Sequence, residues 1–70
     1  MTIQISLGNN VRRIRESKGW SQDKLSEESG LHRTYISGIE RGVRNPTIEI
    51  VQEIALALGV SPSQLLENGD

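Results

Sequence analysis

The chain has 70 residues, no cysteine, a single histidine and a formal net charge of −1. This length predicts one domain over residues 1–70, and the missing cysteines exclude disulfide bonds and thiolate metal sites. With His32 alone, neither a metal nor another cofactor is expected. No apolar run approaches the roughly 18 residues of a membrane span, and residues 2–6 lack the apolar segment of a signal peptide, so a cytoplasmic protein with no membrane contact is expected.

The charges are distributed unevenly along the chain. Residues 1–46 hold all eight Lys and Arg residues and five acids, a net charge of +3. Residues 47–70 hold four acids and no basic residue, a net charge of −4. A cationic end could therefore face phosphate while an acidic end points away from it. The alternative is ordinary charge variation in a small domain.

The first predicted helix has one apolar stripe at helical spacing, made by Leu7, Val11 and Ile14. Ser6 is expected to cap its start and Gly19 to end it. Residues 2–5 form either a disordered lead or an extension of this helix.

Two short helices follow, separated by Gly30. Ser21 is the expected N-cap of the first of them, and Gly30 ends it because glycine accepts the left-handed conformation at a helix end. His32 is a weak cap for the next helix, which Gly42 ends. Residues at the spacing of a hydrophobic staple flank both starts, namely Trp20 with Leu25 and Leu31 with Ile36.

The last two predicted helices are apolar on one side. Thr47 caps the fourth helix and Gly59 ends it. Its expected buried stripe consists of Val51, Ile54, Ala55 and Leu58. Residues 61–64, Ser-Pro-Ser-Gln, combine a cap, a first-turn proline and a capping-box glutamine. Strand signals are absent, so the fold class is all-α, a compact bundle of five helices.

The second and third helices, at about residues 21–41, have the features of a helix-turn-helix. Gly30 provides the turn, and Ser26 is a small residue where two steeply crossing helices would touch. The exposed face of the later helix would carry polar side chains, and no pair of residues there suggests covalent chemistry. The pattern therefore points to a protein that reads DNA.

The segment from Gln22 to Glu40, with Arg41-Gly42 and Asn45-Pro46 after it, resembles the lambda-repressor-like helix-turn-helix family of the xenobiotic-response-element type. The resemblance covers roughly residues 7–67. Ser26 departs from it, since the family usually has alanine there, and a slight weakening of packing is expected.

Residues 32–47, HRTYISGIERGVRNPT, closely resemble the controller proteins of restriction–modification systems. This resemblance implies a sequence-specific transcriptional regulator of double-stranded DNA that acts as a homodimer on a palindromic operator. It also implies autoregulation, with the protein associated with the bacterial nucleoid when bound.

Three residues of the recognition helix are candidates for reading bases. Arg33 can make a bidentate contact to guanine, and Thr34 can offer its methyl group to thymine or its hydroxyl to a base or phosphate. Ser37 lies one turn further along the same face. Gly38 would let this helix approach DNA closely. The alternative is that these residues form an ordinary solvated helix face.

Five residues are candidates for the DNA backbone. The resemblance assigns Gln22, at the start of the second helix, to a phosphate. Tyr35 either reaches the backbone with its hydroxyl or packs beside Ile39. Candidates in or near the loop after the recognition helix are Arg41, Arg44 and Asn45, and Arg44 could instead reach into a groove. His32 is expected to be exposed.

The resemblance also predicts a partly buried salt bridge between Arg15 and Glu40. Glu40 lies on the helix nearest to DNA, where an unpaired carboxylate would repel phosphate. The alternative is that Glu40 is a solvated surface acid.

The C-terminal helices, residues 47–67, are expected to form the dimer interface. One recognition helix reads too few base pairs to specify a site, so two-fold symmetry with half-sites about 34 Å apart is expected. Leu65 and Leu66 cannot both enter one small core, and Ile50 falls off the buried stripe of its helix and is expected to be exposed. We therefore expect Ile50 and one of the two leucines in this interface, with a tetramer on DNA as a further possibility.

Three other interpretations stay open. A phage or mobile-element repressor, or an antitoxin, would keep the DNA binding. A protein–protein adaptor would use the same fold but would need an apolar patch where Arg33, Thr34 and Ser37 are polar. An enzyme is disfavoured because no nucleophile has a base at a credible position.

Overall fold

Five α-helices build the fold in residues 2–68, the part of the chain that the computed structural model describes. They are α1 (Ile3–Ser17), α2 (Gln22–Ser29), α3 (Arg33–Glu40), α4 (Ile48–Leu58) and α5 (Pro62–Leu66). No strand occurs in this range, so the all-α prediction is confirmed. None of the helices in residues 2–68 has the length and apolar character needed to cross a membrane.

The first helix starts earlier than its apolar stripe indicates. Thr2 is the N-cap, and its Oγ1 accepts a hydrogen bond from the Ile5 N–H at 3.3 Å. The prediction that Ser6 caps this helix is wrong, because Ser6 lies inside the helix and is buried. Residues 3–5 are thus a helix extension. The helix ends before Gly19, whose φ of 73° is the left-handed conformation expected of a terminating glycine.

The other helix starts follow the capping pattern of the sequence. Ser21 accepts a hydrogen bond from the Lys24 N–H, and Thr47 accepts one from the Ile50 N–H. Ser61 and Gln64 form the complete capping box at α5. His32 occupies the N-cap position of α3 but makes no side-chain hydrogen bond there. Caps satisfy N–H groups that lack partners within the helix, which is why these short helices have sharp starts.

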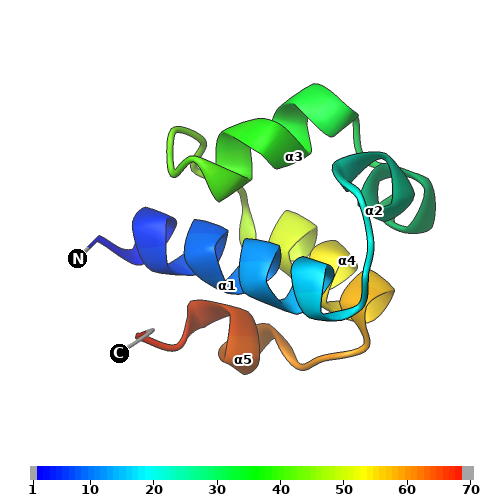
Figure 1. Ribbon diagram of the computed structural model, residues 1–70. Coiled ribbons are helices and arrows are strands. Elements are labelled where there is room, and N and C mark those ends of the chain that lie inside the picture. The colour runs from blue at the N-terminus through cyan, green and yellow to red at the C-terminus, as the bar shows by residue number, and fades with distance from the viewer. Residues whose placement is uncertain (1, 69–70) are drawn as a thin grey trace.

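The core draws apolar side chains from all five helices. Its buried members are Leu7, Val11, Ile14, Leu25, Ile36, Ile39, Val51, Ile54, Ala55, Leu58 and Leu65. Figure 1 shows α3 and α5 on opposite sides of α1, with α2 and α4 closing the bundle. The central helix α1 therefore positions α3 on one side and α5 on the other.

Asn10 fixes α5 against α1, which the sequence did not indicate. Its side chain is buried, and its Nδ2 donates to the carbonyl oxygens of Leu65 at 2.9 Å and Glu67 at 2.8 Å. These carbonyls lie at the C-terminal end of α5, where no further helical turn supplies donors. A five-residue helix thus gains a defined position from one buried amide.

Two of the residues expected in a dimer interface, Leu65 and Ile50, are less exposed than predicted. Leu65 is completely buried in the core, so it is not available to a partner. Leu66 is 37% exposed, since successive helical residues point about 100° apart. Ile50 is half-buried and packs against the core, contrary to the expectation that it is exposed.

Candidate nucleic-acid interface

The turn between α2 and α3 is held by hydroxyl groups. The Ser26 Oγ donates to the Leu31 carbonyl oxygen across the turn. The Gly30 N–H donates to the Ser26 carbonyl at 2.9 Å, with Gly30 in the left-handed conformation at φ 77°. Serine at position 26 therefore adds a hydrogen bond that alanine lacks. The expected slight weakening of packing stays a prediction.

The predicted ion pair between Arg15 and Glu40 is confirmed. Arg15 Nε and Nη2 lie 2.7 Å and 2.9 Å from the two carboxylate oxygens of Glu40, and the side chains are only 10% and 4% exposed. Arg15 Nη1 also donates to the Trp20 carbonyl at 2.8 Å. The hydrogen bond to Glu40 raises the pKa of Arg15, against the opposing effect of burial. This bidentate pair joins α1 to the C-terminal end of α3 and neutralises Glu40.

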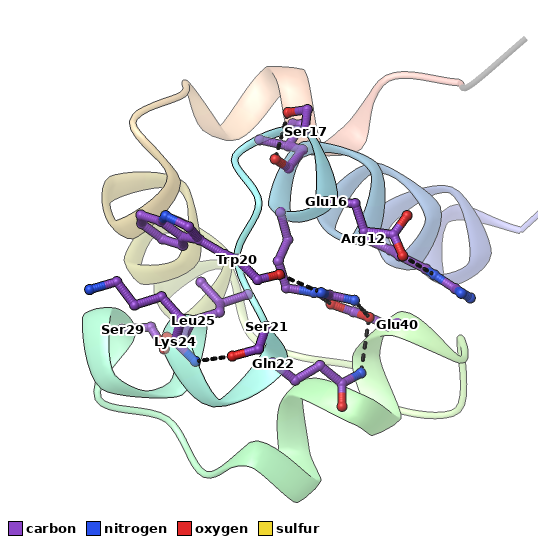
Figure 2. Close-up of polar contacts among 12 residues, drawn as sticks. Arg12, Glu16, Ser17, Trp20, Ser21, Gln22, Lys24, Leu25, Ser29 and Glu40 are labelled. Carbon is purple, nitrogen blue, oxygen red and sulfur yellow. Dashed lines mark hydrogen bonds and ion pairs between the residues drawn. The ribbon is translucent and has the colours of Figure 1, made fainter.

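Gln22 connects the start of α2 to the same carboxylate. Its Nε2 donates to Glu40 Oε1 at 3.0 Å, a contact that Figure 2 shows between the labelled side chains. Glu40 therefore accepts hydrogen bonds from both α1 and α2. This contact occupies one amide hydrogen of Gln22, and its predicted contact with a DNA phosphate stays a prediction.

Gly8 sets the distance between α1 and α3. A Cβ atom at this position would lie 2.3 Å from the Ile39 carbonyl oxygen and 2.8 Å from that of Glu40. Only glycine lets α1 approach the end of α3 this closely. This role of Gly8 was not predicted from the sequence, because the first helix was expected to start at Ser6. A glycine on the buried side of a helix interior was the signal that could have revealed it.

The candidate base-reading residues share the outer face of α3. Arg33 and Thr34 are exposed and Ser37 is half-exposed. Ile36 and Ile39 lie on the opposite face of the same helix, at 0% and 1% exposure. One side of α3 is thus anchored in the core while the other presents polar groups, the arrangement that major-groove reading requires.

Arg44 folds back over α3. Its guanidinium carbon lies 5.6 Å from the centre of the Tyr35 ring, within cation–π range. A Cβ atom added to Gly38 would lie only 2.6 Å from Cγ of Arg44. Gly38 is therefore covered by the Arg44 side chain, and the expected close approach of DNA at this glycine stays a prediction. Tyr35 is half-buried against the core and supports this arginine.

The remaining backbone candidates border the loop after α3. Arg41 is the C-cap residue of α3, and both Arg41 and Asn45 are exposed. The Val43 N–H donates to the Gly38 carbonyl at 3.0 Å, which ties the loop to the helix. Arg33, Arg41 and Arg44 thus place three exposed cations along α3 and its following loop. Their contacts with DNA stay predictions.

We expect Gly38→Ala to displace Arg44 from α3 while leaving the fold largely intact. The obstructing atoms are Cγ, Nε and Cδ of Arg44, which belong to a side chain and not to the backbone, and alanine is the better helix former by about 1 kcal/mol. Affinity for DNA should fall about as much as it does in Arg44→Ala, and the double variant should show little additional loss. Fluorescence anisotropy with a labelled duplex measures the affinity. Additive losses would contradict this coupling between Gly38 and Arg44.

A short helix with one buried and one polar face, held by a glycine turn to a preceding helix, defines a helix-turn-helix domain. The family described as Helix-turn-helix matches residues 11–65, and the chain belongs to this family.

Similar proteins include regulators of restriction–modification systems. The chain is 52% identical to the control protein C.BamHI of Bacillus amyloliquefaciens over 93% of this chain and 82% of that protein. It is 39% identical to the restriction–modification controller protein C.AhdI of Aeromonas hydrophila, whose crystal structure superposes with a TM-score of 0.85 over 89% of this chain and 94% of that one. It is also similar to the biofilm regulator SinR in complex with DNA, at 34% identity and a TM-score of 0.82 over 87% of this chain and 98% of that one.

Proposed function

We propose that this protein is a transcriptional regulator that binds double-stranded DNA sequence-specifically through α3. The observation that carries the proposal is the exposed polar face of Arg33, Thr34 and Ser37 on a helix whose opposite face is anchored in the core. In this role α3 lies in the major groove, where Arg33 reads guanine while Thr34 and Ser37 contact neighbouring bases. The similarity to the SinR–DNA complex supports this mode of binding.

Phosphate contacts would fix the register of α3 on the duplex without carrying sequence information. The side chains that we assign to them are Gln22, Tyr35, Arg41, Arg44 and Asn45. The charge distribution supports this orientation, because residues 47–70 carry only acids among their charged side chains and would face away from DNA.

The regulator that we propose is a homodimer on a palindromic operator and controls a restriction–modification operon that includes its own gene. Similarity to C.BamHI and C.AhdI supports the biological role. Two copies of α3 would read successive turns of the major groove on one face of the duplex, which doubles the sequence that is read.

An apolar groove between α1, the loop before α4, α4 and α5 supports a dimer interface. Its lining includes Ile3, Ile48 and Leu66, which are 60%, 81% and 37% exposed. Exposed apolar side chains gathered at one place are typical of a protein–protein contact. Of the residues expected from the sequence, Leu66 keeps this assignment, and Ile48 and Ile3 join it.

We expect Ile48→Glu to produce a monomer at concentrations where the wild type is dimeric, because the charge would be buried at the interface. Leu56→Glu is the matched control, since Leu56 is 73% exposed on the same helix and does not line the groove. Sedimentation equilibrium over a concentration series measures the dissociation constant. Equal effects of the two substitutions would argue against this groove as the interface.

The proposed function is tested by selecting bound sequences from a random double-stranded DNA library. We expect an enriched palindrome with half-sites about one helical turn apart. Arg33→Ala should lower the preference for that palindrome over random DNA by about 5- to 150-fold for each half-site, since one bidentate guanine contact discriminates by about 1–3 kcal/mol.

Arg13→Ala is the charge-matched control for this experiment. Arg13 is exposed on α1 and contacts Asn10, the residue that holds α5, so it lies away from α3. Its loss should leave the preference for the palindrome unchanged. A library without enrichment at low salt would contradict sequence-specific DNA binding.

A further inference from the structure

An ion pair between the two helices of the helix-turn-helix involves the residue that we expect to read guanine. Asp23 lies in the first turn of α2, and its Oδ1 is 3.2 Å from the Nε of Arg33, the first residue of α3. Both side chains are well exposed, at 75% for Asp23 and 63% for Arg33. The resemblance and the charge pattern gave Asp23 no role.

This ion pair contributes little to the stability of the fold. Exposed pairs are screened by solvent, and fixing two flexible side chains offsets most of the attraction. The two helices are already joined by buried Leu25 and Ile36 and by the hydrogen bond from Ser26 to Leu31. The main effect of Asp23 is therefore on the position of the Arg33 side chain.

The contact leaves the recognition end of Arg33 available. Asp23 Oδ1 approaches Nε of Arg33, so a bidentate contact to guanine O6 and N7 can be made through the Nη groups. Holding Nε restricts the guanidinium to fewer orientations before DNA arrives, and a side chain that is already ordered loses less entropy on binding. The carboxylate also opposes transfer of Arg33 to a nearby phosphate, because this would leave Asp23 unpaired beside a phosphate.

We propose that Asp23 is a specificity-determining residue that positions Arg33 for its base and disfavours a contact of Arg33 with the DNA backbone. This inference rests on the proposed function and names one further residue in the same interface. In this role Asp23, an acidic residue within a cationic surface, weakens non-specific DNA binding more than it weakens specific binding.

The test measures binding of the full chain to two duplexes of equal length, the enriched palindrome and a random sequence. Asp23→Ala should lower the ratio of the two affinities about 3- to 10-fold, part of the discrimination that a bidentate arginine supplies. Affinity for the random duplex should rise, and its dependence on salt should steepen, because the freed Arg33 displaces an additional counterion. Thermal unfolding is followed in parallel and should change little.

Glu28→Ala is the matched control. Glu28 is also an exposed acid on α2, and it pairs with Lys24 at 3.0 Å instead of with a base-reading residue. Its removal changes the net charge equally, so it measures the general electrostatic effect on DNA binding. Arg33→Ala and the double variant Asp23→Ala/Arg33→Ala complete a cycle that isolates the coupling between the two residues.

The proposal requires that Asp23→Ala lowers the affinity ratio more than Glu28→Ala does, and that this excess disappears in the Arg33→Ala background. An equal change in Asp23→Ala and Glu28→Ala would overturn it, as would an effect of Asp23→Ala that persists without Arg33. If the wild type itself shows no preference for any sequence, the proposed function fails first. These results separate a failure of the inference from a failure of the function.

Discussion

Replacing Arg15 by leucine is expected to lower the free energy of unfolding by about 3–5 kcal/mol, the range for removing one partner of a buried ion pair. The Glu40 side chain is 4% exposed and would keep only Gln22 as a hydrogen-bond donor among the side-chain contacts described above. The Trp20 carbonyl would lose the Arg15 donor as well. Urea denaturation measures the loss, and the same variant should bind DNA weakly because Glu40 ends the recognition helix.

Two further variants make this prediction specific. Arg12→Ala removes the exposed pair of Arg12 and Glu16, whose side chains are 64% and 55% exposed, and should cost less than about 1 kcal/mol. Arg15→Leu with Glu40→Leu removes both buried charges and should recover much of the lost stability. An Arg15→Leu variant as stable as Arg12→Ala would show that losing the buried ion pair costs no more free energy of unfolding than losing an exposed one.

The pH dependence of this ion pair follows from the direction of the pKa shift. The hydrogen bond to Glu40 raises the pKa of Arg15 above its already high ordinary value. A group with a raised folded-state pKa contributes its full stabilisation below its unfolded-state pKa and loses it only as the pH rises through the folded-state pKa. Arg15 should therefore stay charged between pH 6 and pH 9, and the wild type should lose none of the stabilisation from this pair as the pH rises through that range, which urea denaturation at both pH values measures.

Gly8→Ala is expected to destabilise the protein by about 1–3 kcal/mol, although the same change in an ordinary helix interior stabilises by about 1 kcal/mol. The new methyl group would lie 2.3 Å from the Ile39 carbonyl oxygen, a backbone atom that cannot move aside by rotating a bond. The end of α3 must then shift away from α1. DNA affinity should fall further than the lost stability explains, since Arg33, Thr34 and Ser37 move with the helix. Denaturation and anisotropy titration on one preparation measure both quantities.

Gly38→Ala is the natural comparison for Gly8→Ala. Both changes add one methyl group to a buried glycine in a helix, but the neighbour of Gly38 is the flexible side chain of Arg44. The two variants should thus differ in stability by more than about 1 kcal/mol. Equal stabilities would mean that α3 can move at no cost, and the role given to Gly8 would be wrong.

Local patterns in the sequence were sufficient to predict most of the secondary structure. Ser21, Thr47 and Ser61 cap their helices as expected, and Gly30 and Gly59 end theirs in the left-handed conformation. These interactions join residues within four positions of each other, so spacing along the chain is enough to predict them. The error at Ser6 arose because the apolar stripe starts later than the helix does.

The ion pair of Arg15 with Glu40 was predicted by resemblance to a family, since nothing in the spacing of two residues 25 positions apart indicates a contact. The outward face of α3 was predictable from its own residues, because Ile36 and Ile39 identify the buried side and leave Arg33, Thr34 and Ser37 on the other.

Local patterns along the chain were thus enough to predict the five helices, most of their limits and the polar face of the recognition helix. The contacts between helices, in contrast, follow only from the tertiary structure. It placed Gly8 under the end of α3, used Asn10 to hold α5, buried Leu65 instead of Leu66 and brought Asp23 to Arg33. Each of these outcomes depends on how one helix is rotated and translated against another. Packing of the whole core sets those positions, and no short stretch of sequence encodes them.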